Sequence, residues 1–149
     1  MKSKSKAVKA NDKQRTDRRI RKHVLCVDSD ENTCKVMATL LAGSGYEVTH
    51  TTTIADGLNL ARRRSFDLLL LDWQLKDGTG VELCQMIRTF NSQIPILFYS
   101  AKADDSDAKS AISAGAQGCL VKPVEVMNLL QTISHYMVAR DGEAQKPRS

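Results

Sequence analysis

The chain has 149 residues, of which 42% are hydrophobic and 26% are charged. This composition is close to that of an average globular domain, and it excludes collagen-like, coiled-coil and wholly disordered chains. The length suits one domain with a buried core and is too short for two ordinary ones. The densest apolar run, Leu68 to Leu71, ends at Asp72 and is far shorter than the roughly eighteen residues of a membrane-spanning helix.

The formal net charge of +5 is unevenly distributed along the chain. Residues 1–22 contain ten Lys and Arg and two Asp, so they carry +8 and leave −3 for the remainder. We predict a basic disordered arm over residues 1–22, a folded domain over residues 23–139 and a flexible tail over residues 140–149. No apolar segment follows the arm as it would in a signal peptide, so we expect a cytoplasmic protein. We interpret the arm as solubilising and expect no nucleic-acid or membrane partner.

Between these ends, short buried runs alternate with stripes of helical period. Strands are predicted at residues 24–27, 46–50, 68–71, 94–99 and 119–121. The residues predicted to face the sheet from the intervening helices are, in chain order, Val36, Met37, Leu40, Leu41, Ile54, Leu58, Ala61, Leu83, Cys84, Ile87, Phe90, Ala108, Ala111, Ile112, Val126, Leu129, Leu130, Ile133 and Met137. This rhythm predicts a single α/β domain, a five-stranded doubly wound parallel sheet with helices on both faces.

Four cysteines, at positions 26, 34, 84 and 119, are scattered singly along the chain. None has the short paired spacing of a zinc or redox motif. We therefore interpret them as reduced core residues.

Polar residues stand where the predicted strands end. Asp28, Ser29 and Asp30 follow the first strand, and Asp72 follows the third. Ser100 ends the fourth strand and Lys122 follows the fifth. The carboxyl ends of parallel strands share one edge of the sheet, where such folds bind their ligands. We therefore expect carboxylates, a hydroxyl and a lysine to converge there.

This combination predicts phosphoryl chemistry. Neighbouring carboxylates repel one another unless a cation neutralises them. Oxygen ligands of this kind suit Mg²⁺, which is usually held by one or two carboxylates and a phosphate. With Mg²⁺ and Lys122 present, Asp72 can act as a nucleophile toward phosphorus and form an acyl phosphate. The transferred group adds negative charge and acceptor oxygens that Mg²⁺, Lys122 and the Ser100 hydroxyl can share.

A simpler interpretation is that each acidic residue only caps a helix, as Asp30 or Asn32 could for the first helix and Asp104 for the fourth. Asp72 fits that interpretation least well, because it directly follows four leucines and precedes Trp73 without turn residues.

The segments VLCVDSDEN, FDLLLLDWQLKDGTGVEL, PILFYSAK and AGAQGCLVKP, in this order, closely resemble the receiver domain of two-component response regulators. The resemblance spans about Val24 to Met137 and implies the flavodoxin-like receiver fold. It implies that Asp72 is the phosphoacceptor, with Ser100 as the switch hydroxyl and Lys122 as the phosphoryl-binding lysine. The implied metal ligands are Asp28, Asp72 and the main-chain carbonyl of Gln74, and the implied Lys122–Pro123 peptide is cis.

The sequence departs from the family pattern at three places. Ser29 stands where the family usually has a second acid that binds the metal, and Asp30, one residue on, is the nearest substitute. Lys76 replaces a proline in the loop after Asp72. Cys119 replaces the aromatic switch residue, so coupling through a rotating ring is not available.

The resemblance implies a signalling protein rather than an enzyme. The expected donor is a sensor histidine kinase or a phosphotransfer protein. Because the sequence ends soon after the last predicted helix, we expect the signal to pass to an unidentified downstream protein. The surface of the fourth helix, fifth strand and last helix is our expected face for that partner or for a homodimer.

Three alternatives stay open. The main one is a degenerate receiver-like interaction module that phosphorylation does not regulate, as Ser29 and Cys119 would suggest. A phosphatase of the haloacid-dehalogenase type would use Asp28-Ser29-Asp30, but it leaves Asp72 unexplained. A nucleic-acid binder that uses the basic arm would lose affinity steeply with salt. A flavin site is disfavoured, because the DSDENT loop is too acidic for a phosphate.

Overall fold

The computed structural model describes residues 21–100, 105–121 and 126–145. The strands of its main sheet are β1 (His23–Val27), β2 (Glu47–Thr51), β3 (Leu68–Leu71), β6 (Ile96–Ser100) and β7 (Gly118–Val121). Two short strands, β4 (Gln74–Leu75) and β5 (Gly78–Thr79), form a hairpin outside that sheet. The helices are α2 (Glu31–Gly43), α3 (Ile54–Arg63), α4 (Gly80–Arg88), α5 (Asp105–Ser113) and α6 (Val126–Gln145).

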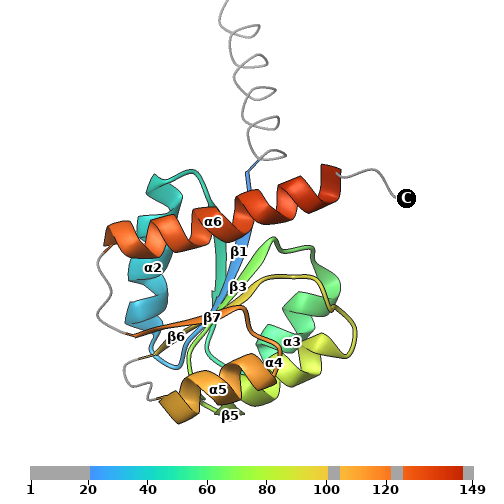
Figure 1. Ribbon diagram of the computed structural model, residues 1–149. Helices are drawn as coiled ribbons and strands as arrows, with labels where there is room; N and C mark the ends of the chain where they lie inside the picture. The colour runs from blue at the N-terminus through green and yellow to red at the C-terminus, as the bar shows by residue number, and fades with distance from the viewer. Residues whose placement is uncertain (1–20, 101–104, 122–125, 146–149) are drawn as a thin grey trace, which may run out of the picture.

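The main sheet is a five-stranded parallel sheet in the order β2-β1-β3-β6-β7. Figure 1 shows α2 and α6 on one face of it and α3, α4 and α5 on the other. The predicted doubly wound α/β architecture is therefore confirmed. Strand order reverses between β1 and β3, and the loops that leave the carboxyl ends of these two strands are the place where such a fold binds a ligand.

Each face of the sheet has its own core. On one face, Cys34, Met37 and Leu41 of α2 and Leu129, Ile133 and Met137 of α6 pack on alternate strand residues. On the other face, residues of α3, α4 and α5 pack on the remaining strand residues. The four leucines of β3 are at most 1% exposed, as a strand covered on both faces requires.

Three residues predicted to face the sheet are instead exposed: Val36 by 58%, Ile112 by 53% and Phe90 by 42%. Val36 and Ile112 each directly precede or follow a buried residue of the same helix, so they lie beside the apolar stripe rather than on it. Phe90 lies beyond the end of α4 at Arg88 and no longer follows its helical period.

Several boundaries also differ from the predicted ones by one or two residues. The third strand is as predicted, whereas the second and fourth begin later, at Glu47 and Ile96. Helix α6 continues to Gln145, through residues predicted as a C-terminal tail. The predicted arm lies almost wholly outside the described residues. None of the helices within the described ranges combines the length and the hydropathy that a bilayer crossing requires.

Candidate functional site

The pairing of β1 with β3 brings two of the predicted site residues together. Val27 is the register partner of Leu71, so Asp28 and Asp72 are the next residues on adjacent strands. The main-chain amide of Asp72 donates to the carbonyl of Val27 over 2.8 Å, and the amide of Asp28 donates to the carbonyl of Thr51 over 3.1 Å. Both residues are thus held by the ladders that define the sheet, at its carboxyl edge.

Asp28 is only 2% exposed, and it is the only charged residue classed as buried in the described part of the chain. Its Oδ1 atom accepts a hydrogen bond from the main-chain amide of Asp30 over 2.9 Å. Burying a carboxylate is costly unless it is hydrogen-bonded or paired with a cation. Because Asp28 is buried at the edge where such folds bind their ligands, helix capping alone does not account for it.

Asp72 is partly buried, and its Oδ1 atom accepts a hydrogen bond from the main-chain amide of Trp73 over 2.8 Å. The Trp73 ring packs on Phe98, with 5.4 Å between the ring centroids. The first residue of α4, Gly80, lies against the same segment: a Cβ atom at this position would collide with the Asp72 carbonyl and with the Phe98 ring. The sheet, α4 and an aromatic pair therefore fix the backbone of Asp72.

The structure gives Asp30 the role of a helix cap, as the simpler interpretation had proposed. Its Oδ1 atom accepts from the Asn32 amide over 3.0 Å, and its Oδ2 atom accepts from the Thr33 hydroxyl over 2.9 Å. Both oxygens are thus occupied at the N-terminus of α2, and the residue is exposed. Ser29, between this cap and Asp28, is half-buried.

The predicted hydroxyl and lysine belong to the neighbouring strand ends. Ser100 ends β6 and is the register partner of Val121, the last residue of β7. Lys122 follows directly in the sequence, but Lys122 and its peptide bond to Pro123 lie outside the described residues. The topology thus brings the backbone of Ser100 to the edge where Asp28 and Asp72 lie, and Lys122 stays a prediction.

Gln74 lies in the β4–β5 hairpin, which had been predicted only as a turn. Gln74 pairs with Thr79, and the Gly80 amide donates to the Trp73 carbonyl over 2.9 Å. Hydrogen-bonded and non-hydrogen-bonded pairs alternate in an antiparallel ladder. Trp73 and Gly80 form a hydrogen-bonded pair, so the main-chain groups of Gln74 point away from the partner strand. The Gln74 carbonyl is therefore not used to pair the two hairpin strands, as a main-chain metal ligand requires.

These residues can be tested against the needs of a magnesium ion. The described residues contain no group of three or more His, Cys, Asp or Glu that could hold a metal. Mg²⁺ does not require such a group, because it usually keeps several waters and takes one or two carboxylates. The buried Asp28, the adjacent Asp72 and the outward carbonyl of Gln74 are oxygen donors of this kind and fit the ion.

Sequence reasoning missed Asp77, which links the hairpin to α3. Its Oδ1 atom accepts from the Ile54 amide over 2.6 Å and its Oδ2 atom from the Ala55 amide over 3.1 Å. The hydrogen bond from Ile54 is the main reason that the pKa of Asp77 lies below its usual value, with Ala55 adding to it against partial desolvation. The two ends of this contact are 23 residues apart. The Asp77-Gly78 pair signals a turn and carries no sign of that distant partner.

The cysteines are free thiols, as predicted. Cys26, Cys34 and Cys84 are buried, whereas Cys119 is only half-buried. Cys119 packs against the core beneath α3, α4 and α5 and is the register partner of Phe98. Burial raises the pKa of its thiol, with a smaller contribution from Asp107. The thiol is therefore protonated at neutral pH, as in a packing residue.

Comparison with known proteins agrees with this geometry. The family model of the response regulator receiver domain matches residues 24–134. The polar-differentiation response regulator DivK of Brucella ovis is 30% identical over 118 residues, which cover 78% of this chain and 96% of DivK. A receiver domain protein of Methanospirillum hungatei has a TM-score of 0.79 at 27% identity, with 83% of this chain and 98% of that one covered.

Longer relatives match over one part of their length. The transcriptional regulatory protein ZraR of Klebsiella oxytoca is 34% identical over 111 residues, or 74% of this chain. The aligned part is 25% of ZraR, so the chain spans about a quarter of that relative.

Proposed function

Because the chain belongs to the response regulator receiver family, we propose that Asp72 accepts a phosphoryl group from a phosphohistidine of a sensor kinase or phosphotransfer protein. Mg²⁺ is the proposed cofactor, with Asp28, Asp72 and the Gln74 carbonyl as ligands. Ser100 and Lys122 are the proposed partners of the transferred group. The observation that carries this proposal is the register of β1 and β3, which sets Asp72 beside the buried carboxylate of Asp28.

The proposed step is a displacement at phosphorus. A carboxylate oxygen of Asp72 forms a bond to phosphorus while the bond from phosphorus to the histidine nitrogen breaks. The nitrogen keeps the electron pair of the broken bond, and the product at Asp72 is an acyl phosphate. Mg²⁺ supplies positive charge that offsets the repulsion between the incoming phosphoryl group and the carboxylates.

The residues of this chain contribute position and charge. The ladder bond from the Asp72 amide to Val27 and the contact with Gly80 hold the nucleophile at the edge of the sheet. The Trp73 amide bonds to Oδ1 over 2.8 Å and so restricts the orientation of the carboxylate. Such positioning is a large part of phosphoryl-transfer catalysis in general.

The departure at Ser29 lowers the negative charge available to the metal. Asp30 offers no evident replacement, since capping α2 occupies its two oxygens. We therefore propose that the site binds Mg²⁺ more weakly than a site with two adjacent acids would. The rival function, an interaction module that phosphorylation does not regulate, rests on this same departure and on Cys119.

Intact mass spectrometry separates the two functions. The full chain is incubated with a small phosphodonor, with and without Mg²⁺, and its mass is measured. Wild type should gain one phosphoryl group in the presence of Mg²⁺, and Asp72→Asn should gain none. Asp67→Asn is a matched control, because Asp67 precedes the same strand at the opposite edge of the sheet. An unlabelled wild type would support the interaction module, and equal labelling of wild type and Asp72→Asn would refute the acceptor assignment.

The output of the domain is proposed to be contact with a downstream protein, with no reaction on a separate substrate. The predicted face for that partner or for a homodimer comprises α5, β7 and α6. We also propose that residues 1–22 form a basic arm outside the folded domain and that the protein is cytoplasmic. ZraR and KdpE are named as transcriptional regulatory proteins, and no such activity is assigned to this chain.

A further inference from the structure

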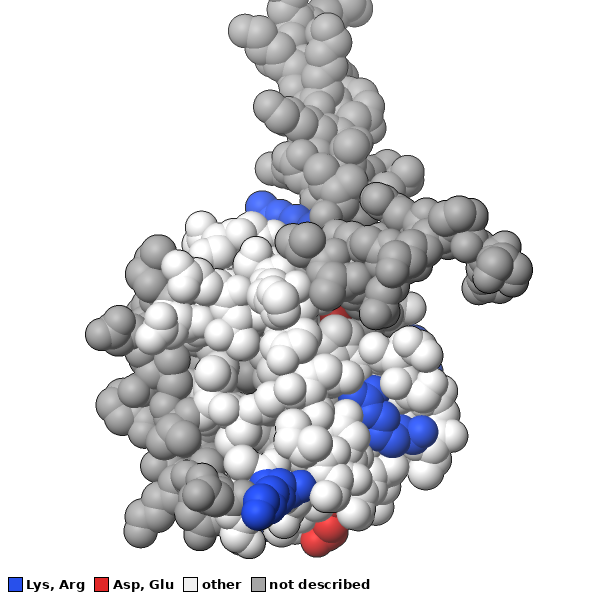
Figure 2. Space-filling model, in the orientation of Figure 1, with Lys and Arg blue, Asp and Glu red and all other residues white. Residues whose placement is uncertain are grey.

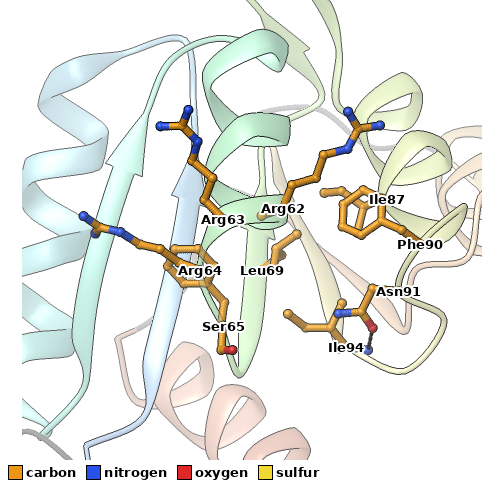
Figure 3. Close-up of a pocket in the computed structure, with 11 residues that line it drawn as sticks. Arg62, Arg63, Arg64, Ser65, Leu69, Ile87, Phe90, Asn91 and Ile94 are labelled. Atoms are coloured by element: carbon orange, nitrogen blue, oxygen red, sulfur yellow. Dashed lines mark hydrogen bonds between the residues drawn. The ribbon is translucent and has the colours of Figure 1, made fainter.

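A pocket lies at the opposite edge of the sheet from Asp28 and Asp72. It has a volume of about 260 Å³ and lies where α3 and α4 end and the chain turns back into β3 and β6. Its floor is formed by Phe66, Leu69, Ile87 and Ile94, which are at most 5% exposed. Figure 3 shows this floor with the side chains of the surrounding rim. The pocket is therefore a depression at the amino edge of the sheet, with buried apolar residues beneath a surface that is mostly polar.

Three consecutive arginines form one rim of this depression. Arg62, Arg63 and Arg64 all line it and are exposed. Within the part of the chain that the structure describes, none of the three guanidinium groups forms an ion pair. The nearest acid in the sequence, Asp67, accepts instead from the main-chain amide of His23 over 2.8 Å. The rim thus carries three positive charges without an acidic partner.

The opposite rim is Phe90, which is 42% exposed. The guanidinium carbon of Arg62 lies over its ring, 5.3 Å from the centroid. Such a cation–π contact holds the cation and the ring in a fixed relation before any partner arrives. Asn91, next to Phe90, accepts from the amides of Gln93 and Ile94 and so fixes the loop that carries the ring.

Stabilisation of α3 explains only part of this arrangement. Basic residues in the last turn favour the negative end of the helix dipole, which accounts for Arg62 and Arg63. Arg64 is the residue that follows the helix. Arg88, near the end of α4, shows what an arginine with a structural role looks like here. Its guanidinium donates to the Gly115 carbonyl from Nε and Nη2 and to the Asn91 carbonyl from Nη1.

We propose that this basic pocket, defined as Arg62, Arg63, Arg64, Phe90 and the apolar floor beneath them, binds an acidic segment of a partner protein. Carboxylates of the segment pair with the arginines that border the depression. Charge-assisted bonds from arginine to carboxylate are among the strongest polar contacts in proteins. The site does not depend on the chemistry of Asp72.

The direction of the arginines favours an extended segment over a single small anion. In Figure 3 the three guanidinium groups lie apart and point away from Leu69 and Ile94, so they do not converge on one point.

The charge on the remainder of the molecule disfavours a nucleic acid as the partner. The chain beyond residue 22 carries a net charge of −3. On the face shown in Figure 2, the basic side chains of the described residues form separate groups rather than a continuous surface.

The test is a titration of the isotope-labelled full chain with a synthetic peptide in which glutamates flank one leucine. Amide NMR signals report where the peptide binds, which matters because residues 1–22 carry +8 and attract any polyanion. We expect saturable shifts centred on residues 61–66 and 87–94. The triple variant Arg62→Gln, Arg63→Gln, Arg64→Gln should lower the affinity at these signals by about tenfold or more. A peptide with glutamine in place of each glutamate should bind there more weakly.

A second triple variant, Lys35→Gln, Lys76→Gln, Lys109→Gln, removes the same charge from other surfaces and should leave these shifts unchanged. Phe90→Leu tests the rim without loss of charge and should weaken binding less than the arginine variant. An equal loss in both triple variants would refute the site. Tighter binding of a single-stranded oligonucleotide, or full competition by inorganic phosphate, at the same signals would also refute it. The arginine triple variant should keep the phosphodonor labelling of wild type, so this proposal and that for Asp72 can fail separately.

Discussion

The two edges of the sheet hold charged residues in opposite ways. At the carboxyl edge, Asp28 is buried and accepts a main-chain amide, and Asp30 and Asp77 each cap a helix with both oxygens. At the amino edge, Arg62, Arg63 and Arg64 are exposed and have no acidic partner among the described residues. The acids thus form hydrogen bonds that help to hold the fold, whereas these three arginines form no ion pair with any residue that the structure describes.

The difference follows from the direction of the parallel strands and helices. Helices begin at the carboxyl edge, where free amides attract acids, and end at the amino edge, where free carbonyls attract bases. An acid can cap several amides with one short side chain, so it becomes fixed. A long arginine side chain interacts with a helix end less specifically and keeps its charge available in water. Charge at the carboxyl edge therefore positions groups, whereas the charge of these three arginines is available to a partner.

The largest expected effect is the loss of the close contact at the carboxyl edge. Gly80→Val places a side chain against the Asp72 carbonyl and the Phe98 ring, so either the start of α4 or the Asp72 backbone must move. We expect a loss of about 1–3 kcal/mol in the free energy of unfolding, measured by urea denaturation. Gly43→Ala is the control, because nothing lies within 4 Å of its added Cβ. An equal loss in the two variants would contradict the tight fit.

The next effect tests whether arginines at the amino edge differ in role. Arg88→Ala removes three hydrogen bonds to main-chain carbonyls and should cost about 1–3 kcal/mol in the free energy of unfolding. Arg63→Ala should change it by no more than about 0.5 kcal/mol, as expected of an exposed residue without a partner. Thermal and urea unfolding of both variants check this. A large loss in Arg63→Ala would mean that the basic pocket is structural.

A smaller effect tests whether Mg²⁺ binds at the carboxyl edge. If Mg²⁺ binds there, it stabilises the folded chain by about 1.4 kcal/mol once its free concentration is ten times the Kd. The melting temperature of wild type should therefore rise with Mg²⁺, while that of Asp28→Ala should not. Sodium chloride of equal ionic strength is the control. Trp73 fluorescence should follow the same titration, and a response retained in Asp28→Ala would place the ion elsewhere.

The smallest effect concerns the cap on α3. Since the pKa of Asp77 is lowered in the folded chain, its carboxylate stabilises the fold above the unfolded pKa, and this contribution is lost as pH falls through the folded value. Asp77→Asn should thus be slightly less stable than wild type at pH 7, and the two should converge below about pH 4. Urea denaturation across this pH range measures the difference. A gap that stayed constant with pH would mean that the charge of Asp77 has no part in the cap.

Much of the carboxyl edge could be predicted because its signals are local. A buried run such as Leu68–Leu71 followed by Asp72 marks a strand end within a few residues, and parallel pairing then brings that end beside Asp28. The cap by Thr53 on α3 is equally local, since its hydroxyl accepts from the Asp56 amide over 3.1 Å. Asp30 was predicted as an alternative cap, and the structure gives it that role.

The amino edge could not be predicted in this way. Phe90 carried the helical period of α4 and was expected in the core, but the helix ends at Arg88 and the ring instead meets Arg62 of α3. Arg88 donates to the carbonyl of Gly115, 27 residues further along the chain. No local sequence pattern predicts this hydrogen bond, because it forms only where the end of α4 and the loop between α5 and β7 lie side by side in the folded chain.

The sequence by itself determined the alternation of strands and helices, the five strands of the main sheet and the polar residues at their carboxyl ends, since these depend on periodicity and on neighbours within one turn. Tertiary structure alone decided that Asp77 caps α3, that Gly80 lies on the Asp72 carbonyl and that three arginines and Phe90 border one depression. These features arise between segments far apart in sequence, so they exist only once the helices pack on the sheet.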